Sequence, residues 1–230
     1  YSIGKRLVEK YLHQPYSWFL NRHSSDLGKT VLSEVGQVVG YGINPLIELI
    51  AKGTIAFALI TLLIIADPKL AIIVGLSLCG AYGLIFYFVR GYLNRIGNER
   101  LKKNQLRFIS ISEAFGATKE VKVAGLEKTY MNRFSDSARG YAHTVASSQA
   151  VSQLPRYILE AIAFGGIMLV ILYLMAQTGS FSNALPIISL YAFAGYRLMP
   201  ALQQIYSALT QLTYVGPSLD KLYDDFKNLE

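Results

Sequence analysis

LIELIAKGTIAFALITLLIIADPKLAIIVGLSLCGAYGLIFYFV, residues 46–89, holds two long apolar runs with only the tripeptide DPK between them. The first run covers residues 46–66 and the second covers residues 70–89. An α-helix needs roughly 20 apolar residues to cross the hydrocarbon core of a bilayer, and both runs reach about that length. The stretch therefore predicts a membrane hairpin of two helices.

The same arrangement recurs later in the chain. Residues 157–176 and 185–202 form a second apolar pair, joined by QTGSFSNA at residues 177–184. Hydrophobic residues make up 52% of the chain, which agrees with a polytopic membrane protein. The alternative is a soluble domain with four buried helices, and it is disfavoured because apolar runs of this length are uncommon in soluble folds. The single cysteine excludes an intrachain disulfide.

Lysine and arginine are concentrated between the two hairpins. Residues 90–156 carry twelve Lys or Arg and five Asp or Glu, whereas residues 177–184 carry no charge. Positively charged loops remain in the cytoplasm, so the long segment, the N-terminal region and the C-terminal tail are expected to lie inside the cell. The net charge of +7 is then largely a consequence of topology. Nucleic-acid binding is not expected, because no basic run has interleaved aromatic residues.

The long basic segment has the periodicity of helices. Apolar residues recur at helical intervals over residues 93–109 and again over residues 130–145. Between these stretches, Gly116 and Gly125 bracket a short segment. We therefore expect residues 90–156 to form a cytoplasmic arm pair, two long helices joined by a short helix at the tip.

The N-terminal region, residues 1–45, has the same design in a shorter form. Lys5 to Asn21 is expected to be a descending helix, Ser24 to Gly28 a tip, and Lys29 to Asn44 an ascending helix that enters the first apolar run. After the last apolar run, residues 203–230 are expected to continue as a cytoplasmic extension.

Two segments carry a resemblance to a known family. FLNRHSSDLGKTVLSEV, residues 19–35, and EAFGATKEVKVAGLEKTYMNRF, residues 113–134, resemble the two cytoplasmic loops of ABC exporter transmembrane domains. The resemblance implies an all-α, polytopic membrane helical bundle whose long helices extend into the cytoplasm. It also implies that two membrane helices precede Tyr1 and that an ATP-binding domain follows Glu230, which would leave the chain truncated at both ends.

In this family the tips are coupling helices that dock onto the ATP-binding domains. The resemblance places two sets of residues in this role: His23, Ser24, Ser25, Asp26 and Leu27, and Glu113, Ala114, Phe115, Gly116, Ala117, Thr118 and Lys119. It further implies a homodimer, an ATP-binding domain on the same or a partner polypeptide as binding partner, and ATP and Mg as cofactors of the parent protein.

The chain itself is not expected to bind ATP or a metal. Gly28, Lys29 and Thr30 read GKT, the end of a phosphate-binding loop, but the pattern needs a glycine where His23 stands. No motif for ATP hydrolysis is present, so enzymatic activity is left open. The three histidines have no metal-ligand spacing.

A polar wall is expected in the second hairpin. Arg197 lies within an apolar run, where an ionisable side chain is costly and usually faces the bundle interior or water. Other polar residues recur on its helix face at spacings near three and seven, giving the set Ser189, Arg197, Gln204, Ser207 and Gln211.

Charged residues on the preceding helix are expected to lie close to Arg197. That helix is expected to start at Pro155 and Arg156, with Glu160 one turn further on. Glu160 and Arg197 differ in depth by about four residues, or roughly 6 Å along a helix. Two interpretations stay open. Either Glu160 neutralises Arg197 in a structural pair, or Arg197, together with Arg156, presents guanidinium groups to an anionic substrate.

A narrower resemblance bears on the substrate. PRYILEAIAF, residues 155–164, and YRLMPALQQIYSALTQLTYVGPSLDKLYDDF, residues 196–226, resemble the flippases that move lipid-linked oligosaccharides across the bacterial inner membrane for protein N-glycosylation. The resemblance implies an amphiphilic substrate whose pyrophosphate needs basic residues in the cavity, which fits Arg156 and Arg197. Together with Glu160 and Gln204, these two arginines form the predicted substrate cavity. The alternatives are an ABC exporter of peptides or hydrophobic compounds, and a membrane scaffold without transport activity.

Overall fold

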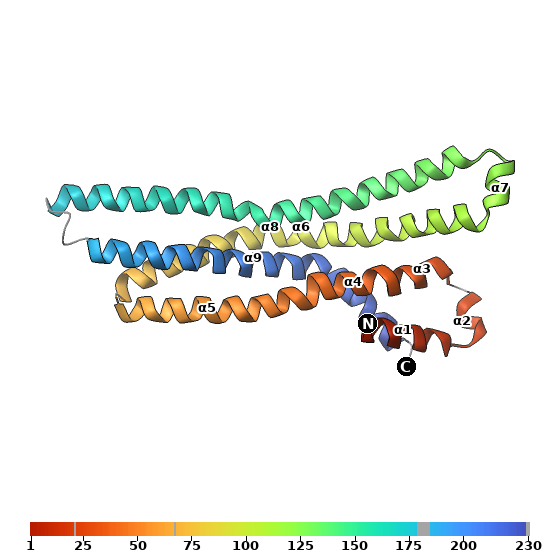
Figure 1. The fold of residues 1–230 in the computed structure, drawn as a ribbon, viewed down its shortest axis with the longest axis horizontal. Helices are drawn as coiled ribbons and strands as arrows, with labels where there is room; N and C mark the ends of the chain where they lie inside the picture. The colour runs from red at the N-terminus through yellow and green to blue at the C-terminus, as the bar shows by residue number, and fades with distance from the viewer. Residues whose placement is uncertain (21, 67, 179–184, 229–230) are drawn as a thin grey trace. The chain divides into compact units, whose positions relative to one another are not determined.

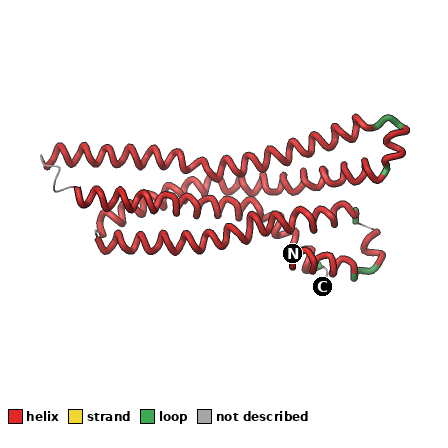
Figure 2. The backbone as a smooth tube through the Cα atoms, in the orientation of Figure 1, coloured by secondary structure: helices red, strands yellow, loops and turns green. Residues whose placement is uncertain are grey.

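The structure is a computed structural model that describes residues 1–20, 22–66, 68–178 and 185–228. Side chains in parts of residues 66–78, 158–178 and 185–197 lie outside that description. Within the described ranges the chain is helical, with short turns and no strand, as the sequence predicts (Figure 2). The all-α prediction is therefore confirmed.

The chain divides into two compact units. Unit 1 contains residues 1–45, 90–149 and 211–230, and unit 2 contains residues 46–89 and 150–210. The boundary between residues 45 and 46 coincides with the start of the first predicted membrane run. The boundary between residues 89 and 90 coincides with the end of the second run. The division into units does not test for a membrane, so the assignment of these runs as membrane spans stays a prediction.

Eleven helical segments follow one another along the described residues (Figure 1). In chain order they are α1 (Ser2–Leu12), α2 (Tyr16–Leu20), α3 (Ser24–Lys29), the π-helix η1 (Thr30–Glu34), α4 (Val35–Val38), the π-helix η2 (Val39–Ile43), α5 (Asn44–Ala66), α6 (Pro68–Gly116), α7 (Thr118–Val123), α8 (Glu127–Thr178) and α9 (Leu185–Lys227). The three longest helices, α6, α8 and α9, contribute residues to both units.

The first predicted tip is wrong. The descending helix α1 ends at Leu12 rather than Asn21, and the short helix that follows is α2, Tyr16–Leu20. Pro15 explains the difference, because proline cannot continue a helix and drives the residue before it out of the helical region. Ser24 to Gly28, predicted as the tip, instead begins the ascending helix after His23, whose backbone is extended at φ −75° and ψ 129°.

The second connection follows the predicted order. Helix α6 ends at Gly116, the short helix α7 follows, and α8 begins at Glu127. Gly125 has φ 64°, a left-handed conformation that favours glycine. Around it the amide of Leu126 donates to the carbonyl of Val121 at 2.9 Å and the amide of Gly125 donates to Lys122 at 3.4 Å. This is a Schellman termination, which caps α7 and turns the chain into α8.

The predicted helix start at Pro155 is wrong. Pro155 lies inside α8, which runs from Glu127 to Thr178. A proline removes one backbone hydrogen bond and strains the preceding turn, but a helix of 52 residues keeps the hydrogen bonds of its other turns.

The core of unit 1 joins the N-terminal helix to the end of α9. Its buried residues are Leu7, Tyr11, Val35, Val38, Val215 and Leu222, contributed by α1, α4 and α9. Trp18 of α2 packs against this cluster, and its ring centroid lies 5.5 Å from that of Tyr11. The short helix α2 is thus held by its aromatic side chain.

The described core of unit 2 is formed by α5, α6 and α9. Its buried residues are Ala56, Tyr82, Leu198, Ala201, Leu202 and Tyr206. The rings of Tyr82 and Tyr206 lie 5.8 Å apart, and the Tyr206 hydroxyl donates to the carbonyl of Val151 on α8 at 3.5 Å. Aromatic residues therefore connect the helices of this unit.

Many large apolar side chains of unit 2 are nevertheless exposed. On α5, Ile50, Phe57 and Ile65 are 70%, 73% and 80% exposed. Exposed apolar surface on this scale indicates contact with lipid or with another protein. Within the described residues, one continuous helix, Ser24–Ile65, is long and apolar enough to cross a membrane by length and composition. The other three predicted runs include residues whose side chains lie outside the description.

Two glycines on long helices of unit 1 give a matched test of the packing. A Cβ on Gly97 of α6 would clash with the backbone oxygen of Tyr214 on α9, whereas a Cβ on Gly140 would meet only the flexible Lys103 side chain. We expect Gly97→Ala to lower the free energy of unfolding by about 1–3 kcal/mol, because backbone must move to make room.

Gly140→Ala is the control, and we expect it to be neutral or slightly stabilising, since alanine is the better helix former by roughly 1 kcal/mol. Thermal unfolding of both variants in the same detergent gives the comparison. Equal melting temperatures would contradict the close approach of α6 and α9.

Candidate functional site

A buried ion pair lies at the centre of unit 1. The Nη2 atom of Arg100 on α6 lies 2.8 Å from the Oε2 atom of Glu34 at the end of η1, and their side chains are 0% and 1% exposed. Charged side chains are almost never fully buried unless they are paired. This pair therefore fixes α6 against the π-helix.

Polar neighbours complete the coordination of the Glu34 carboxylate. Asn104 donates from Nδ2 to Oε1 at 2.8 Å, and Ser218 of α9 donates from Oγ to Oε2 at 2.9 Å. Arg100 also contacts the Ser218 hydroxyl, and Asn104 makes a further 3.0 Å bond to Ser33. We call Glu34, Arg100, Asn104 and Ser218 the buried polar cluster; it joins η1, α6 and α9.

The cluster keeps Glu34 ionised. Burial would raise the pKa of this carboxyl, but the Arg100 charge and the hydrogen bonds from Asn104, Arg100 and Ser218 together hold the pKa below its ordinary value of 4.5. Because the folded pKa is depressed, the stabilising contribution is present above about pH 4.5 and is lost as the pH falls through the folded value.

Some buried polar atoms within the cluster and beside it have no hydrogen-bond partner in the described part of the chain. These are Nε and Nη1 of Arg100 and the hydroxyl of Tyr214. The Arg100 guanidinium carbon lies 5.7 Å from the Tyr214 ring centroid. Burial raises the pKa of Tyr214 to about 12, so its phenol is neutral at physiological pH.

The GKT segment has no phosphate-loop geometry. Lys29 ends α3, Thr30 begins η1, and both are helical and buried. The Lys29 Nζ atom lies 2.8 Å from Asp26, which also pairs with Lys221 at 3.2 Å. Burial lowers the pKa of Lys29 and outweighs the opposing effect of Asp26. This lysine is occupied by an ion pair within its own unit.

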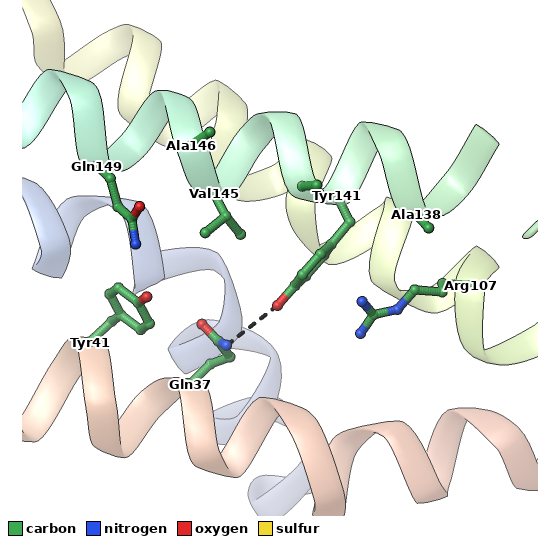
Figure 3. Close-up of a pocket in the computed structure, with 9 residues that line it drawn as sticks. Gln37, Tyr41, Arg107, Ala138, Tyr141, Val145, Ala146 and Gln149 are labelled. Carbon is green, nitrogen blue, oxygen red and sulfur yellow. Dashed lines mark hydrogen bonds between the residues drawn. The ribbon is translucent and has the colours of Figure 1, made fainter. Parts of the chain in front are cut away.

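An open pocket adjoins the buried polar cluster. Its volume is about 520 Å³, and its polar lining residues are Gln37, Tyr41, Arg107, Tyr141 and Gln149 (Figure 3). Its apolar lining consists of Ala138, Ala142, Val145 and Ala146 on α8. Gln37 lies between the two π-helices and Tyr41 lies within η2, so irregular helix geometry positions one wall.

Arg107 connects the pocket to the buried polar cluster. Its Nη2 atom donates to Oδ1 of Asn104 at 2.7 Å, and its guanidinium carbon lies 4.2 Å from the Tyr141 ring centroid. Across the pocket, Gln37 Nε2 donates to the Tyr141 hydroxyl at 3.5 Å (Figure 3). The guanidinium is therefore held in one orientation by a hydrogen bond and an aromatic ring.

Comparison with known proteins assigns the family. Residues 2–199 match the family described as ABC transporter transmembrane region. The chain belongs to this family. It is therefore a membrane protein, and the resemblance inferred from the two loop segments is confirmed.

Three curated relatives of this ABC transporter transmembrane region share one name. The chain is 27% identical over 179 residues to the ATP-dependent lipid A-core flippase of Cupriavidus metallidurans. It is 24% identical to the proteins of the same name from Cupriavidus pinatubonensis and Ralstonia nicotianae. Each match covers 76% of this chain and 30% of the relative, so the chain spans about a third of the length of these relatives.

The structure brings together only part of the predicted substrate set. Arg156 donates from Nε to Oε1 of Glu160 at 2.8 Å, one turn apart on α8, and the two side chains are 49% and 39% exposed. Gln204 lies on α9 and is exposed. The side chain of Arg197 lies outside the described residues, so the proposed pairing of Glu160 with Arg197 stays a prediction.

The predicted coupling residues occupy two helix ends. His23 precedes α3, and Ser24, Ser25, Asp26 and Leu27 form its first turns. In the second set, Glu113, Ala114, Phe115 and Gly116 are the last turn of α6, Ala117 is the N-cap of α7, and Thr118 and Lys119 begin that helix. Their role in coupling stays a prediction.

The sequence predictions missed the buried polar cluster and the pocket. Glu34 lies 66 positions from Arg100 and 184 from Ser218, and no spacing rule connects residues so far apart. Arg100 and Asn104 are four residues apart and so share a helix face, but on a basic helix this pattern usually marks a solvated surface.

We expect Glu34→Gln to be strongly destabilising at pH 7, by about 3–5 kcal/mol, because it leaves the Arg100 charge buried without a counter-ion. Thermal unfolding of the full-length protein measures the effect. The double variant Glu34→Leu with Arg100→Met is the control, and it should be less destabilised than Glu34→Gln because it removes both charges.

Below pH 4.5 the difference in the free energy of unfolding between wild type and Glu34→Gln should shrink. A difference that stays constant from pH 7 down to the acid unfolding of the wild type would contradict the assignment of an ionised Glu34.

Proposed function

We propose that this chain is the membrane-spanning part of an ATP-driven exporter that flips an anionic glycolipid across the bacterial inner membrane. The observation that carries the proposal is the family match over residues 2–199, combined with three curated relatives that are all named lipid A-core flippases. A scaffold without transport activity has no support from either comparison.

The proposed cargo is a polyprenyl-pyrophosphate-linked glycan or a similar lipid. Its phosphates would need cationic groups, and planar guanidinium groups suit phosphate oxygens because they donate two parallel hydrogen bonds. Arg156 and Arg197 are the proposed donors, with Gln204 on the same wall as Arg197. Glu160 already accepts a hydrogen bond from Arg156, so an arriving phosphate would compete with this carboxylate. The pair would then hold the site closed to weakly charged lipids.

ATP binding outside this chain is proposed to drive the movement. ATP and Mg would be held by an ATP-binding domain on the same or a partner polypeptide, in a homodimer with both ends of this chain in the cytoplasm. The short helices α2 and α7 lie at the same end of unit 1 in Figure 1, and both carry or adjoin exposed apolar side chains. Tyr16 is 78% exposed and Phe115, just before α7, is 76% exposed. These surfaces suit docking, with α2 replacing Ser24 to Gly28 as the first tip.

We expect Arg197→Ala to reduce glycolipid flipping by at least about ten-fold, the size expected for losing a hydrogen bond to a charged group. The measurement is flipping of a fluorescent lipid-linked glycan by the full-length protein in proteoliposomes, alongside basal ATP hydrolysis. Arg90→Ala, which removes an exposed arginine at the end of the second apolar run, is the matched control. Unchanged flipping in the double variant Arg156→Ala with Arg197→Ala, with the protein correctly folded, would remove the anionic-headgroup proposal.

Coupling at α2 and α7 has a separate test. Tyr16→Ala and Phe115→Ala should each retain basal ATP hydrolysis while transport per ATP falls several-fold, because each removes an exposed contact at a tip. Tyr87→Ala is the control, since Tyr87 is equally exposed at 79% but lies in unit 2. If His23→Ala uncouples transport from ATP hydrolysis and Tyr16→Ala does not, the sequence-based tip beside His23 is right and the assignment of the first tip to α2 is wrong.

A further inference from the structure

We propose that the pocket beside the buried polar cluster is a binding site for a phosphorylated sugar. The site is formed by Gln37, Tyr41, Arg107, Tyr141 and Gln149, all in unit 1. It is separate from the proposed cavity residues Arg156 and Arg197. The ligand would be either a soluble sugar phosphate or the headgroup of a lipid-linked glycan, and only the second source rests on the proposed function.

The charge of the lining selects an anion. Arg107 is the one ionisable cation among the lining residues, and the lining contains no carboxylate. The described residues also hold no group of three or more acidic, histidine or cysteine side chains that could bind a metal ion. An anionic ligand would therefore meet one cation without repulsion, whereas a cationic ligand would have no counter-charge.

Arg107 is oriented before the ligand arrives. Its Nη2 atom is bonded to Asn104, whose amide in turn donates to the buried Glu34 carboxylate. Its guanidinium carbon lies over the Tyr141 ring, 4.2 Å from the ring centroid. A guanidinium carries five N–H donors, so donors at its edge remain for a phosphate oxygen. A side chain held in place loses less entropy on binding than a mobile one.

The remaining lining fits a hydroxyl-rich ring. The Gln37 and Gln149 amides and the Tyr41 and Tyr141 phenols supply both donors and acceptors, which sugar hydroxyls require. The small side chains of Ala138, Ala142 and Ala146 line the pocket from α8, and its volume of about 520 Å³ is within the range of small-molecule sites. A purely apolar ligand could form no hydrogen bond with these amides and phenols, which disfavours it.

The irregular helix geometry around α4 also supports a binding site here. Two π-helices, η1 and η2, flank the four-residue helix α4 that carries Gln37. Such irregular turns are rare and often lie at functional sites, because each one re-aims the side chains that follow it. Here η1 places Glu34 in the buried polar cluster and η2 places Tyr41 on the pocket wall. The segment from η1 to η2 therefore contributes both to the buried polar cluster and to the wall of the pocket.

The experiment measures binding to the full-length protein in lipid nanodiscs without ATP. Glucose 1-phosphate is the soluble probe, with glucose and inorganic phosphate as partial ligands, and calorimetric titration gives the affinities. A polyprenyl-pyrophosphate-linked sugar incorporated in the nanodisc is the lipid probe. We expect at least one phosphorylated sugar probe to bind, and to bind more tightly than glucose or phosphate, because only it satisfies both Arg107 and the amides.

Three variants locate the site. Arg107→Gln should weaken binding by at least about ten-fold, since it removes a charge-assisted hydrogen bond. Ala146→Leu should weaken it as much by filling the pocket, and it leaves Arg107 and the buried polar cluster untouched. Arg133→Gln is the matched control, because Arg133 is also an arginine of unit 1 near an aromatic ring, but it is 61% exposed and lies outside the pocket.

The outcomes separate the site from the cargo. Loss of glucose 1-phosphate binding in Ala146→Leu, with full binding in Arg133→Gln, supports the site whatever the transport assay shows. Loss that is confined to the lipid probe supports the site and assigns it to the cargo. Equal affinity of wild type and Ala146→Leu for both phosphorylated sugar probes would overturn the proposal, as would a failure of both probes to bind. Neither of those two results would affect the flippase proposal, which rests on the transport of glycolipid and on Arg197.

Discussion

The arrangement of unit 1 depends on the burial of one ion pair. Glu34 and Arg100 are almost completely shielded from water, and neither charge is tolerable there without the other. Ser218 and Asn104 occupy the remaining positions on the carboxylate, so three separate parts of the chain must meet at this point. An apolar core of equal size could hold the same helices together, but it would accept several registers. A carboxylate with defined partners restricts the register, so we expect the pair to contribute more to the specificity of this unit than to its stability.

The Glu34–Arg100 pair also influences the orientation of the neighbouring side chains that lead to the pocket. Asn104 donates to Glu34 with its amide nitrogen and accepts from Arg107 with its amide oxygen, so the orientation of its amide is set from both sides. Arg107 in turn stacks on Tyr141, and Tyr141 accepts a hydrogen bond from Gln37. The chain of contacts thus starts in the buried interior and ends at an open pocket. Any movement of η1 relative to α6 would change the buried cluster and the pocket together.

The sequence predicts the long helices well because their signals are local. Apolar runs mark the first hairpin, and Gly116 and Gly125 mark the connection between α6 and α8, where a left-handed residue is required at Gly125. The predicted helix from Lys5 to Asn21 runs through Pro15, whereas α1 ends at Leu12, before this proline. The buried polar cluster could not be predicted, since its members lie far apart in the chain and each one resembles a surface residue by itself. Long-range packing, and not local propensity, decides which charges become buried.

Helix α6 contains one segment with exposed apolar side chains and another with buried polar side chains. Leu84, Tyr87 and Phe88 expose 61%, 79% and 73% of their surface, which is acceptable in contact with lipid and costly in water. Between about one and four turns beyond Phe88, Leu93, Arg100 and Asn104 are completely buried. If the helix continued with arginine and asparagine at lipid depth, each polar group would need a partner inside the hydrocarbon. Placing the buried charges beyond the apolar run allows water to hydrate the outer basic residues while the inner ones pair. The change of residue types along α6 therefore separates a segment suited to lipid from one that can be specified by polar contacts.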